Sequence, residues 1–225
     1  MSEIIIFQNQ KFSILQLAIL RAFCELTRME KTKLPNPSME TIPHLSRPEY
    51  GLREIAQIII HYFWPIFQGN FISQSESETE QNIKLKFRKH LTNIIPSYFG
   101  NWEESYLLFK NELNLTLHNR LIDQNKGLMI KSCLHSIEQA ILKGPVSSIH
   151  KNTEQNFITF HPKTKTLHLI GEYKDIILHE SNDFLLALKN HWLSLTLKWN
   201  PNSSYGIDEL KEKIYWDSFK SEISI

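Results

Sequence analysis

The sequence predicts a mainly α-helical fold with a β-hairpin or a small three-stranded sheet in the C-terminal half. Apolar residues recur at helical spacing through the first two thirds of this 225-residue chain. The pattern then alternates around a lysine-rich turn, and helical spacing returns near the C-terminus. We therefore expect a helical domain over residues 1–145, and a hairpin with C-terminal helices over residues 146–225, packed together as one α+β unit. A winged-helix-like arrangement is an alternative within this class.

The expected helices follow from spacing and from end signals. Residues 12–28 are apolar on nearly every face, which is typical of a buried central helix. In the segment 51–71, Pro65 predicts that the regular helix ends or kinks at Trp64, because proline disfavours the helical conformation of the preceding residue. Asn101 is a favourable N-cap for the helix that follows it. Further helices are expected over residues 83–99, 127–145, 181–199 and 206–220.

The remaining segments are expected to be strands or loops. Residues 156–173, "NFITFHPKTKTLHLIGEY", alternate around a turn and predict a hairpin, to which residues 175–180, "DIILHE", add a third short strand. Residues 31–51 contain four prolines and predict an irregular loop. Residues 70–82, "NFISQSESETEQN", are polar in composition and predict a mobile surface loop.

The charge balance excludes a polycationic protein that binds nucleic acid over its whole surface. The chain has 25 basic and 24 acidic residues, for a formal net charge of +1, so any nucleic-acid contact must come from a local patch. The two cysteines do not suggest a disulfide framework. No segment has the roughly 18 uninterrupted apolar residues of a membrane span, so we expect a cytoplasmic protein that does not contact a membrane.

The chain contains no strong catalytic signature, and we predict no catalytic residue, metal ion, cofactor or small-molecule site. Metal-ligand spacings and glycine-rich phosphate loops are lacking in the sequence. His161 and His168 could face each other across the hairpin, but two partly exposed strand histidines are the simpler interpretation. Glu172 and Lys174 would mimic half of a metal-dependent nuclease core if they alternated at a strand end. A solvated ion pair is the simpler alternative.

Two basic clusters are the candidate nucleic-acid-binding residues. One lies within "KLKFRKH" on a predicted helix and the other lies at the hairpin tip. Such cations hold phosphates, although exposed turns are also lysine-rich for solubility. The predicted phosphate contacts are Lys84, Lys86, Arg88, Lys89, Lys163 and Lys165. The aromatic residues proposed for a protein interface are Trp64, Trp192 and Trp199.

Two apolar and aromatic segments, which follow an apolar opening helix, carry a family resemblance. Residues 13–26, "SILQLAILRAFCEL", open the chain, residues 52–67 read "LREIAQIIIHYFWPIF", and residues 190–201 read "NHWLSLTLKWNP". In this order they resemble the helical N-terminal region of HNH-type restriction or phage-defence endonucleases. After the equivalent of Pro201 that family continues into a zinc-stapled nuclease module, whereas the 24 residues that follow here contain neither cysteine nor histidine. The resemblance thus implies the recognition region without the cutting module.

Three functions remain open from the sequence. The first is a non-catalytic subunit of a bacterial phage-defence or restriction-like system, which binds DNA or docks a nuclease or ATPase. The second is an adaptor or structural subunit that contacts only other proteins. The third is a metal-dependent nuclease that uses Glu172 and Lys174.

Overall fold

The chain forms two compact units, each built from two separate parts of the sequence. The computed structural model describes residues 12–32, 48–76, 78–82, 84–118, 120, 123–146 and 157–216. Unit 1 combines Met1–Ala56 with Gln139–Trp192, and unit 2 combines Gln57–Glu138 with Leu193–Ile225. The boundaries between the units fall within three helices, α3 (Leu52–Phe67), α6 (Gln124–Ile141) and α8 (Ser181–Trp199). The expected division at residues 145/146 stays a prediction.

Unit 1 contains a three-stranded antiparallel sheet in the order β1-β3-β2. Strands β2 (Ile158–His161) and β3 (Thr166–Leu169) form the predicted hairpin, in which His161 pairs with Thr166. Strand β1 (Glu49–Gly51) pairs with the other edge of β3. The Leu52 backbone amide donates to the Lys165 carbonyl oxygen at 2.9 Å, so the start of α3 is bound to the hairpin turn.

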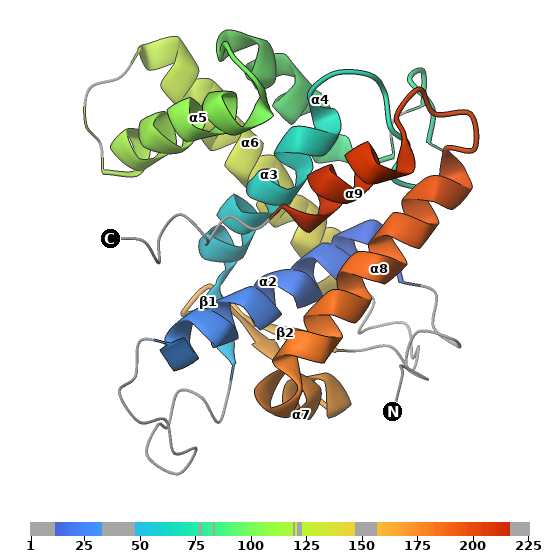
Figure 1. Cartoon of the computed structure of the whole chain (residues 1–225). Helices are drawn as coiled ribbons and strands as arrows, with labels where there is room; N and C mark the ends of the chain where they lie inside the picture. The colour runs from blue at the N-terminus through green and yellow to red at the C-terminus, as the bar shows by residue number, and fades with distance from the viewer. Residues whose placement is uncertain are drawn as a thin grey trace. The chain divides into compact units, whose positions relative to one another are not determined.

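Helices α2 (Ile14–Thr32), α7 (Glu172–His179) and the first part of α8 accompany this sheet in unit 1 (Figure 1). Three rings form part of its core, because Phe12 packs edge-on against Phe157 and Tyr173 at centroid distances of 6.2 and 6.0 Å. The π-helical turn η3 (Leu142–Val146) follows α6. The end of the helix expected over residues 127–145, with Gly144 and Pro145, falls within this turn.

Unit 2 is helical. It contains most of α3 and α6 together with α4 (Lys86–Ile94), the 3-10 turn η2 (Ile95–Ser97), α5 (Trp102–Leu117) and α9 (Ile207–Tyr215). Helix α9 lies beside α3 (Figure 1), and Lys213 Nζ donates to the Pro65 carbonyl oxygen at 3.0 Å. Helices α5 and α6 are joined by an ion pair between Glu112 Oε1 and Lys126 Nζ at 3.1 Å.

The prediction that the fold is mainly helical with a small sheet is confirmed, and so is the Asn101 N-cap. Asn101 Oδ1 accepts from the Glu104 backbone amide at 2.9 Å, and Glu104 Oε2 accepts from the Asn101 amide in return. This reciprocal pair satisfies amides at the start of α5 that have no partner within the helix.

Two local predictions are wrong, and a third is wrong in part. Residues 175–180 lie in α7 and its C-cap rather than in a strand, because Tyr173 and Ile177 are buried at helical spacing and α7 begins after its N-cap Gly171, which has φ of 66°. The third strand is instead β1, within the segment predicted to be irregular; residues 33–47 of that segment lie outside the described residues. Helix α3 does not end at Trp64 but continues through Pro65 to Phe67, so the predicted end is wrong, and the alternative of a kink there stays a prediction.

Within the described ranges, no helix is both long enough and apolar enough to cross a membrane.

Candidate functional site

The lysines before and within α4 are exposed, as the phosphate-binding prediction requires. Lys84 precedes the helix, Lys86 is its first residue and Lys89 lies one turn further on. Residues three apart on a helix share a face, so Lys86 and Lys89 lie on the same side of α4. Among the residues that the structure describes, none of the three lysines forms an ion pair. Their charges are therefore available to an anionic partner.

Arg88, the fourth predicted contact in this cluster, is buried and has a structural role. Its side chain is 3% exposed, and Nη1 donates to Glu78 Oε2 at 3.0 Å and to the Ile72 carbonyl oxygen at 2.9 Å. The guanidinium also lies over the rings of Phe67 and Phe71, at 4.4 and 3.9 Å from their centroids. The prediction that Arg88 contacts a phosphate does not fit this geometry.

The helical phase of α4 explains the difference between Arg88 and its neighbours. Phe87, Leu91 and Ile94 recur at three- and four-residue spacing and are buried, and Arg88 lies next to this apolar stripe. Lys86 and Lys89 lie on the opposite side, toward solvent. Burial lowers the pKa of Arg88 from its ordinary value, while the neighbouring Glu78 carboxylate raises it. The guanidinium remains charged under any ordinary condition.

Glu78 is a buried residue whose hydrogen bonds hold the loop between α3 and α4 in place. Its side chain is fully buried, and Oε2 accepts hydrogen bonds from Arg88 and from the Gln74 backbone amide at 2.7 Å. The Ser73 hydroxyl donates to the Glu78 carbonyl oxygen at 2.8 Å. Ile72, Ser73, Gln74 and Glu78 are all buried, so this segment is not the simple polar surface loop that its composition suggested.

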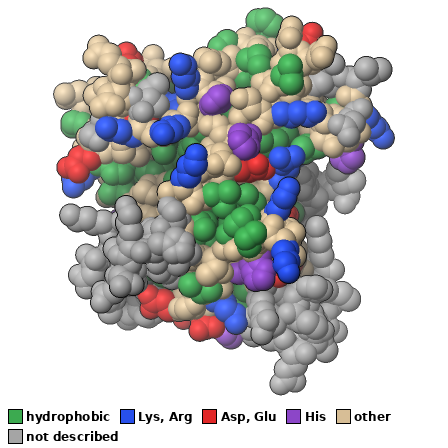
Figure 2. All heavy atoms as spheres, turned by 180° about the vertical axis from the view of Figure 1, so that it is seen from behind, with side chains coloured by type: hydrophobic (Ala, Val, Ile, Leu, Met, Phe, Trp, Pro, Cys, Tyr) green, Lys and Arg blue, Asp and Glu red, His purple; other side chains and the backbone are tan. Residues whose placement is uncertain are grey.

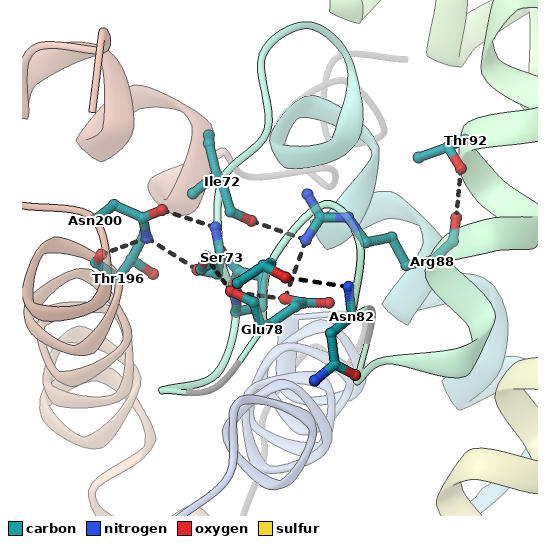
Figure 3. A network of polar contacts seen from close by, with 10 residues as sticks. Ile72, Ser73, Glu78, Asn82, Arg88, Thr92, Thr196 and Asn200 are labelled. Atoms are coloured by element: carbon teal, nitrogen blue, oxygen red, sulfur yellow. Dashed lines mark hydrogen bonds and ion pairs between the residues drawn. The ribbon is translucent and has the colours of Figure 1, made fainter. Parts of the chain in front are cut away.

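Asn200 holds the same loop from the end of α8 (Figure 3). Its Oδ1 accepts from the Ser73 backbone amide at 2.8 Å, and its Nδ2 donates to the Ser73 carbonyl oxygen at 3.0 Å and to the Thr196 carbonyl oxygen at 2.7 Å. The side-chain amide of Asn200 thus pairs with both the N–H and the carbonyl oxygen of Ser73, as the backbone of a neighbouring strand would. Figure 3 shows Arg88 reaching the loop from the side opposite Asn200. The loop is therefore fixed between α4 and α8 within unit 2.

An open pocket of about 790 Å³ lies between this loop and the turn that follows α8. Nothing in the sequence indicated a small-molecule site here. The lining includes the aromatic residues Phe71 and Trp199, the acidic residues Glu78 and Glu80, and a larger number of residues with amide and hydroxyl side chains. These polar residues are Asn70, Ser73, Thr79, Asn200, Asn202, Ser203 and Ser204. The Glu78 side chain itself is fully buried.

The hairpin cluster lies in unit 1. Lys163 and Lys165 are both exposed in the turn between β2 and β3, and Lys165 has φ of 55°. His161 and His168 share one face of the hairpin, with ring centroids 5.0 Å apart. His168 Nε2 also lies 3.3 Å from Glu49 Oε1 on β1. Across the described ranges of the chain, no group of three His, Cys, Asp or Glu side chains has an arrangement that could hold a metal ion.

Two of the three tryptophans proposed for an interface are buried. Trp64 is 0% exposed, and its indole N–H donates to Ser105 Oγ at 2.9 Å while its ring packs on Phe109 with centroids 4.6 Å apart. Trp192 is 1% exposed. Neither ring is presented to a partner, because both side chains are buried. Trp199 is partly exposed and lines the pocket.

Glu172 and Lys174 do not form the strand-end pair that a nuclease core requires. Both lie in the first turn of α7, where residues two apart point to different sides of the helix. The Lys174 backbone amide donates to the Gly171 carbonyl oxygen, which closes this turn. The nuclease interpretation thus has no geometric support at these residues.

Figure 2 shows one face of the molecule, on which the visible Lys and Arg side chains stand singly or in small groups among hydrophobic and histidine side chains. On the part of this face that is described, the positive charge is therefore divided rather than continuous. Phosphate binding on this face would depend on local groups of Lys and Arg side chains rather than on one continuous surface.

Residues 3–198 match the model of a family described as Domain of unknown function (DUF8808). The chain belongs to this family. No curated protein and no solved structure matches the chain. The DUF8808 match includes the whole loop between α3 and α4 together with Glu78 and Arg88, whereas Asn200 and the rest of the turn after α8 lie beyond it.

Proposed function

We propose that this DUF8808 protein is a non-catalytic subunit of a bacterial phage-defence or restriction-like system that binds the DNA backbone. The observation that carries the proposal is the exposure of Lys84, Lys86 and Lys89 on and before α4. The resemblance of two apolar and aromatic segments to the helical region of HNH-type endonucleases supports the setting, and the positions that carry this resemblance have no catalytic role in that family.

The proposed contact is electrostatic and independent of DNA sequence. A lysine that neutralises a phosphate releases a condensed counterion, and affinity then falls as salt concentration rises. Exposed lysines that already pair with carboxylates gain less from a phosphate, because the new interaction replaces an existing one. Lys84, Lys86 and Lys89 have no such carboxylate among the described residues, so each can contribute fully.

Fluorescence anisotropy with a labelled DNA duplex across a salt series tests the proposal. Replacing Lys84, Lys86 and Lys89 with alanine should weaken binding and lower the slope of log affinity against log salt by about 0.9 for each phosphate that is no longer neutralised. The matched control replaces Lys131, Lys198 and Lys211, which are exposed on α6, α8 and α9 of the same unit. An intact protein that fails to bind DNA at low salt, or a control triple whose slope falls as much, would refute direct contact.

The hairpin lysines require their own variant because they belong to unit 1. Replacing Lys163 and Lys165 with glutamine removes two charges from the turn and keeps two flexible side chains of similar length. A further decrease in slope would add the hairpin to the DNA-binding surface, as a winged-helix wing contacts the backbone. An unchanged slope would restrict the DNA-binding surface to the α4 cluster.

The second candidate is a subunit that docks a nuclease, an ATPase or another protein without touching DNA. Exposed leucines on unit 2 favour it: Leu107 and Leu108 on α5 are 52% and 50% exposed, and Leu128 on α6 is 61% exposed. Contiguous exposed apolar residues are typical of protein-binding surfaces. Co-purification of a nuclease or ATPase, abolished by Leu107→Lys and Leu108→Lys and accompanied by no DNA binding, would favour this candidate over the first.

A further inference from the structure

The exposed side of α4 carries a histidine next to the lysines of the proposed DNA contact. Lys86, Lys89, His90 and Asn93 are all exposed and follow one another at three- and four-residue spacing, so they form one polar stripe, the α4 stripe, on the side away from the buried apolar residues. At 1.5 Å per residue this stripe is about 10 Å long. Helix α4 contains no acidic residue. The α4 stripe therefore offers a phosphate two lysines, an imidazole and an amide, and no carboxylate that would repel it.

A contact with α6 orients the His90 ring within this stripe. Its Nδ1 lies 3.4 Å from Ser132 Oγ, a weak hydrogen bond between two exposed residues. The contact occupies one ring nitrogen, and Nε2 has no hydrogen-bond partner among the described residues. Nε2 is thus the nitrogen that can donate to a bound phosphate.

Helix α6 supplies no carboxylate to His90. On this helix His135 follows Ser132 by three residues and lies on the same side, whereas Lys131 lies about 100° round the helix from Ser132. The one acidic residue of α6 is Glu138, and its Oε2 lies 3.9 Å from Nδ1 of His135. Among the described residues no carboxylate forms an ion pair with His90, so a proton on its ring has no counter-charge in the free protein.

The neighbouring lysines couple this proton to phosphate binding. Histidine is the side chain whose charge ordinarily changes between pH 5 and 8. Like charges one turn apart on a helix destabilise each other, so Lys86 opposes a proton on His90, and Lys89, the adjacent residue, adds to this effect. A phosphate that binds the lysines cancels this repulsion and attracts the proton. The proton and DNA therefore favour each other, and by linkage each strengthens the binding of the other by the same factor.

We propose that His90 makes DNA binding by the α4 stripe dependent on pH, because its protonated ring adds one phosphate contact through Nε2–H to those of Lys86 and Lys89. This inference rests on the proposed function and adds the regulation of the same surface. At pH 8.0 only the lysines release counterions, and at pH 5.5 one further ionic contact does so. Affinity should rise roughly two- to fivefold between these values, as expected for one exposed ion pair.

Fluorescence anisotropy of the full chain with a labelled duplex, at pH 8.0 and 5.5 across a salt series, tests the inference. The slope of log affinity against log salt should be steeper by about 0.9 at pH 5.5. His90→Gln keeps an N–H donor but cannot gain the charge, so it should remove this difference between the two pH values. The matched control is His118→Gln, since His118 is an exposed histidine of the same unit at the C-cap of α5. It should retain the full difference.

Nuclear magnetic resonance of the histidine Cε1–H groups follows the proton directly. The signal that disappears in His90→Gln identifies His90. DNA should move the midpoint of its titration to higher pH by roughly 0.3–0.7 unit, which is the two- to fivefold factor on a logarithmic scale. The midpoint of His118 should stay where it is in the free protein.

The outcomes separate this inference from the proposed function. DNA binding at pH 8.0 that becomes neither tighter nor steeper at pH 5.5 would overturn the inference and leave the proposed function standing. An equal loss of pH dependence in His90→Gln and His118→Gln would indicate a general effect of net charge and would also overturn it. Failure to bind DNA at either pH would refute the proposed function, and the inference with it.

Discussion

Replacing Arg88 with methionine tests whether this residue holds the α3–α4 loop or contacts a partner. The substitution keeps a long flexible side chain over Phe67 and Phe71 but removes both hydrogen bonds of Nη1, to Glu78 Oε2 and to the Ile72 carbonyl oxygen. Breaking a buried ion pair at one partner costs about 3–5 kcal/mol, because the remaining charge stays buried without compensation. We expect a decrease of this size in the free energy of unfolding.

The geometry supports the upper part of this range for three reasons. Glu78 is fully buried, so its carboxylate cannot recover water without opening the loop. After the substitution only the Gln74 amide still donates to it among the described residues. The Ile72 carbonyl oxygen is also deprived of its donor, and hydrogen bonds to charged groups contribute about 1.5–3 kcal/mol each. Relief of the desolvation that lowers the pKa of Arg88 offsets part of this cost.

Urea denaturation followed by circular dichroism measures the decrease directly. For a chain of this size each kcal/mol corresponds to about 2–4 °C in Tm, so Arg88→Met should also lower Tm by roughly 6–20 °C. Lys89→Met is the matched control, since Lys89 is the exposed neighbour of Arg88 on the same helix, and a surface change of this kind should stay within about 0.5 kcal/mol. A decrease below about 1 kcal/mol at Arg88, or equal decreases at both positions, would refute a structural role.

Three other substitutions or treatments test the fold elsewhere. Asn101→Ala removes the N-cap of α5 and should cost about 1 kcal/mol in urea denaturation; an unchanged midpoint would contradict the cap. Gly69→Ala should lower the free energy of unfolding by roughly 1–3 kcal/mol, since Gly69 has φ of 103° and a Cβ there would lie 2.5 Å from the Tyr205 hydroxyl. Removal of that hydroxyl by Tyr205→Phe in the same chain should recover only part of the lost stability, because the strained φ remains. Burial raises the pKa of Cys133 to about 12 and that of Cys24 well above its ordinary value, so iodoacetamide at mildly alkaline pH should label both only after unfolding, as mass spectrometry would show.

The sequence predicted those elements whose signals are local. The apolar helix α2, the cap of α5 and the alternating hairpin each depend on residues that are near one another in the chain, and all three are present. Strand β1 could not be found in this way. It has only three residues, and its pairing of Glu49 with His168 joins positions that are far apart in the chain. Pairing over such distances is set by the packing of the whole unit.

The apolar run of residues 175–180 was ambiguous because it is too short for its period to decide between strand and helix. Packing decided it: Tyr173 contacts Phe12, Phe157 and Phe184, and the helix places Ile177 on the same side as Tyr173. The segment after Trp64 shows the opposite case. There Pro65 gave a clear local signal for the end of the helix, but α3 continues to Phe67. The Pro65 carbonyl oxygen accepts a hydrogen bond from Lys213 on α9.

The candidate site also has residues whose place the sequence could predict and residues whose place it could not. Composition identified the basic cluster, but only the phase of α4 separates Arg88 from the lysines. Because Phe87, Leu91 and Ile94 mark the buried side, the sequence already contained a signal that Arg88 borders the core. Glu78 had no such signal. It is one of several acidic residues in a polar segment, and its burial results from the approach of Arg88 to a loop that Asn200 fixes from α8.

The salt dependence of DNA binding distinguishes the two roles within this single basic cluster. If Arg88 orders the loop and the lysines hold phosphates, then Arg88→Met can weaken binding only by disturbing the position of α4. Its affinity would fall at every salt concentration by the same factor, and the slope against log salt would stay that of the intact protein. Removal of Lys84, Lys86 and Lys89 instead eliminates counterion release and lowers the slope itself. A reduced slope in a folded Arg88→Met protein would therefore mean that the guanidinium leaves Glu78 to bind DNA, and the buried ion pair would be a resting arrangement rather than a permanent one.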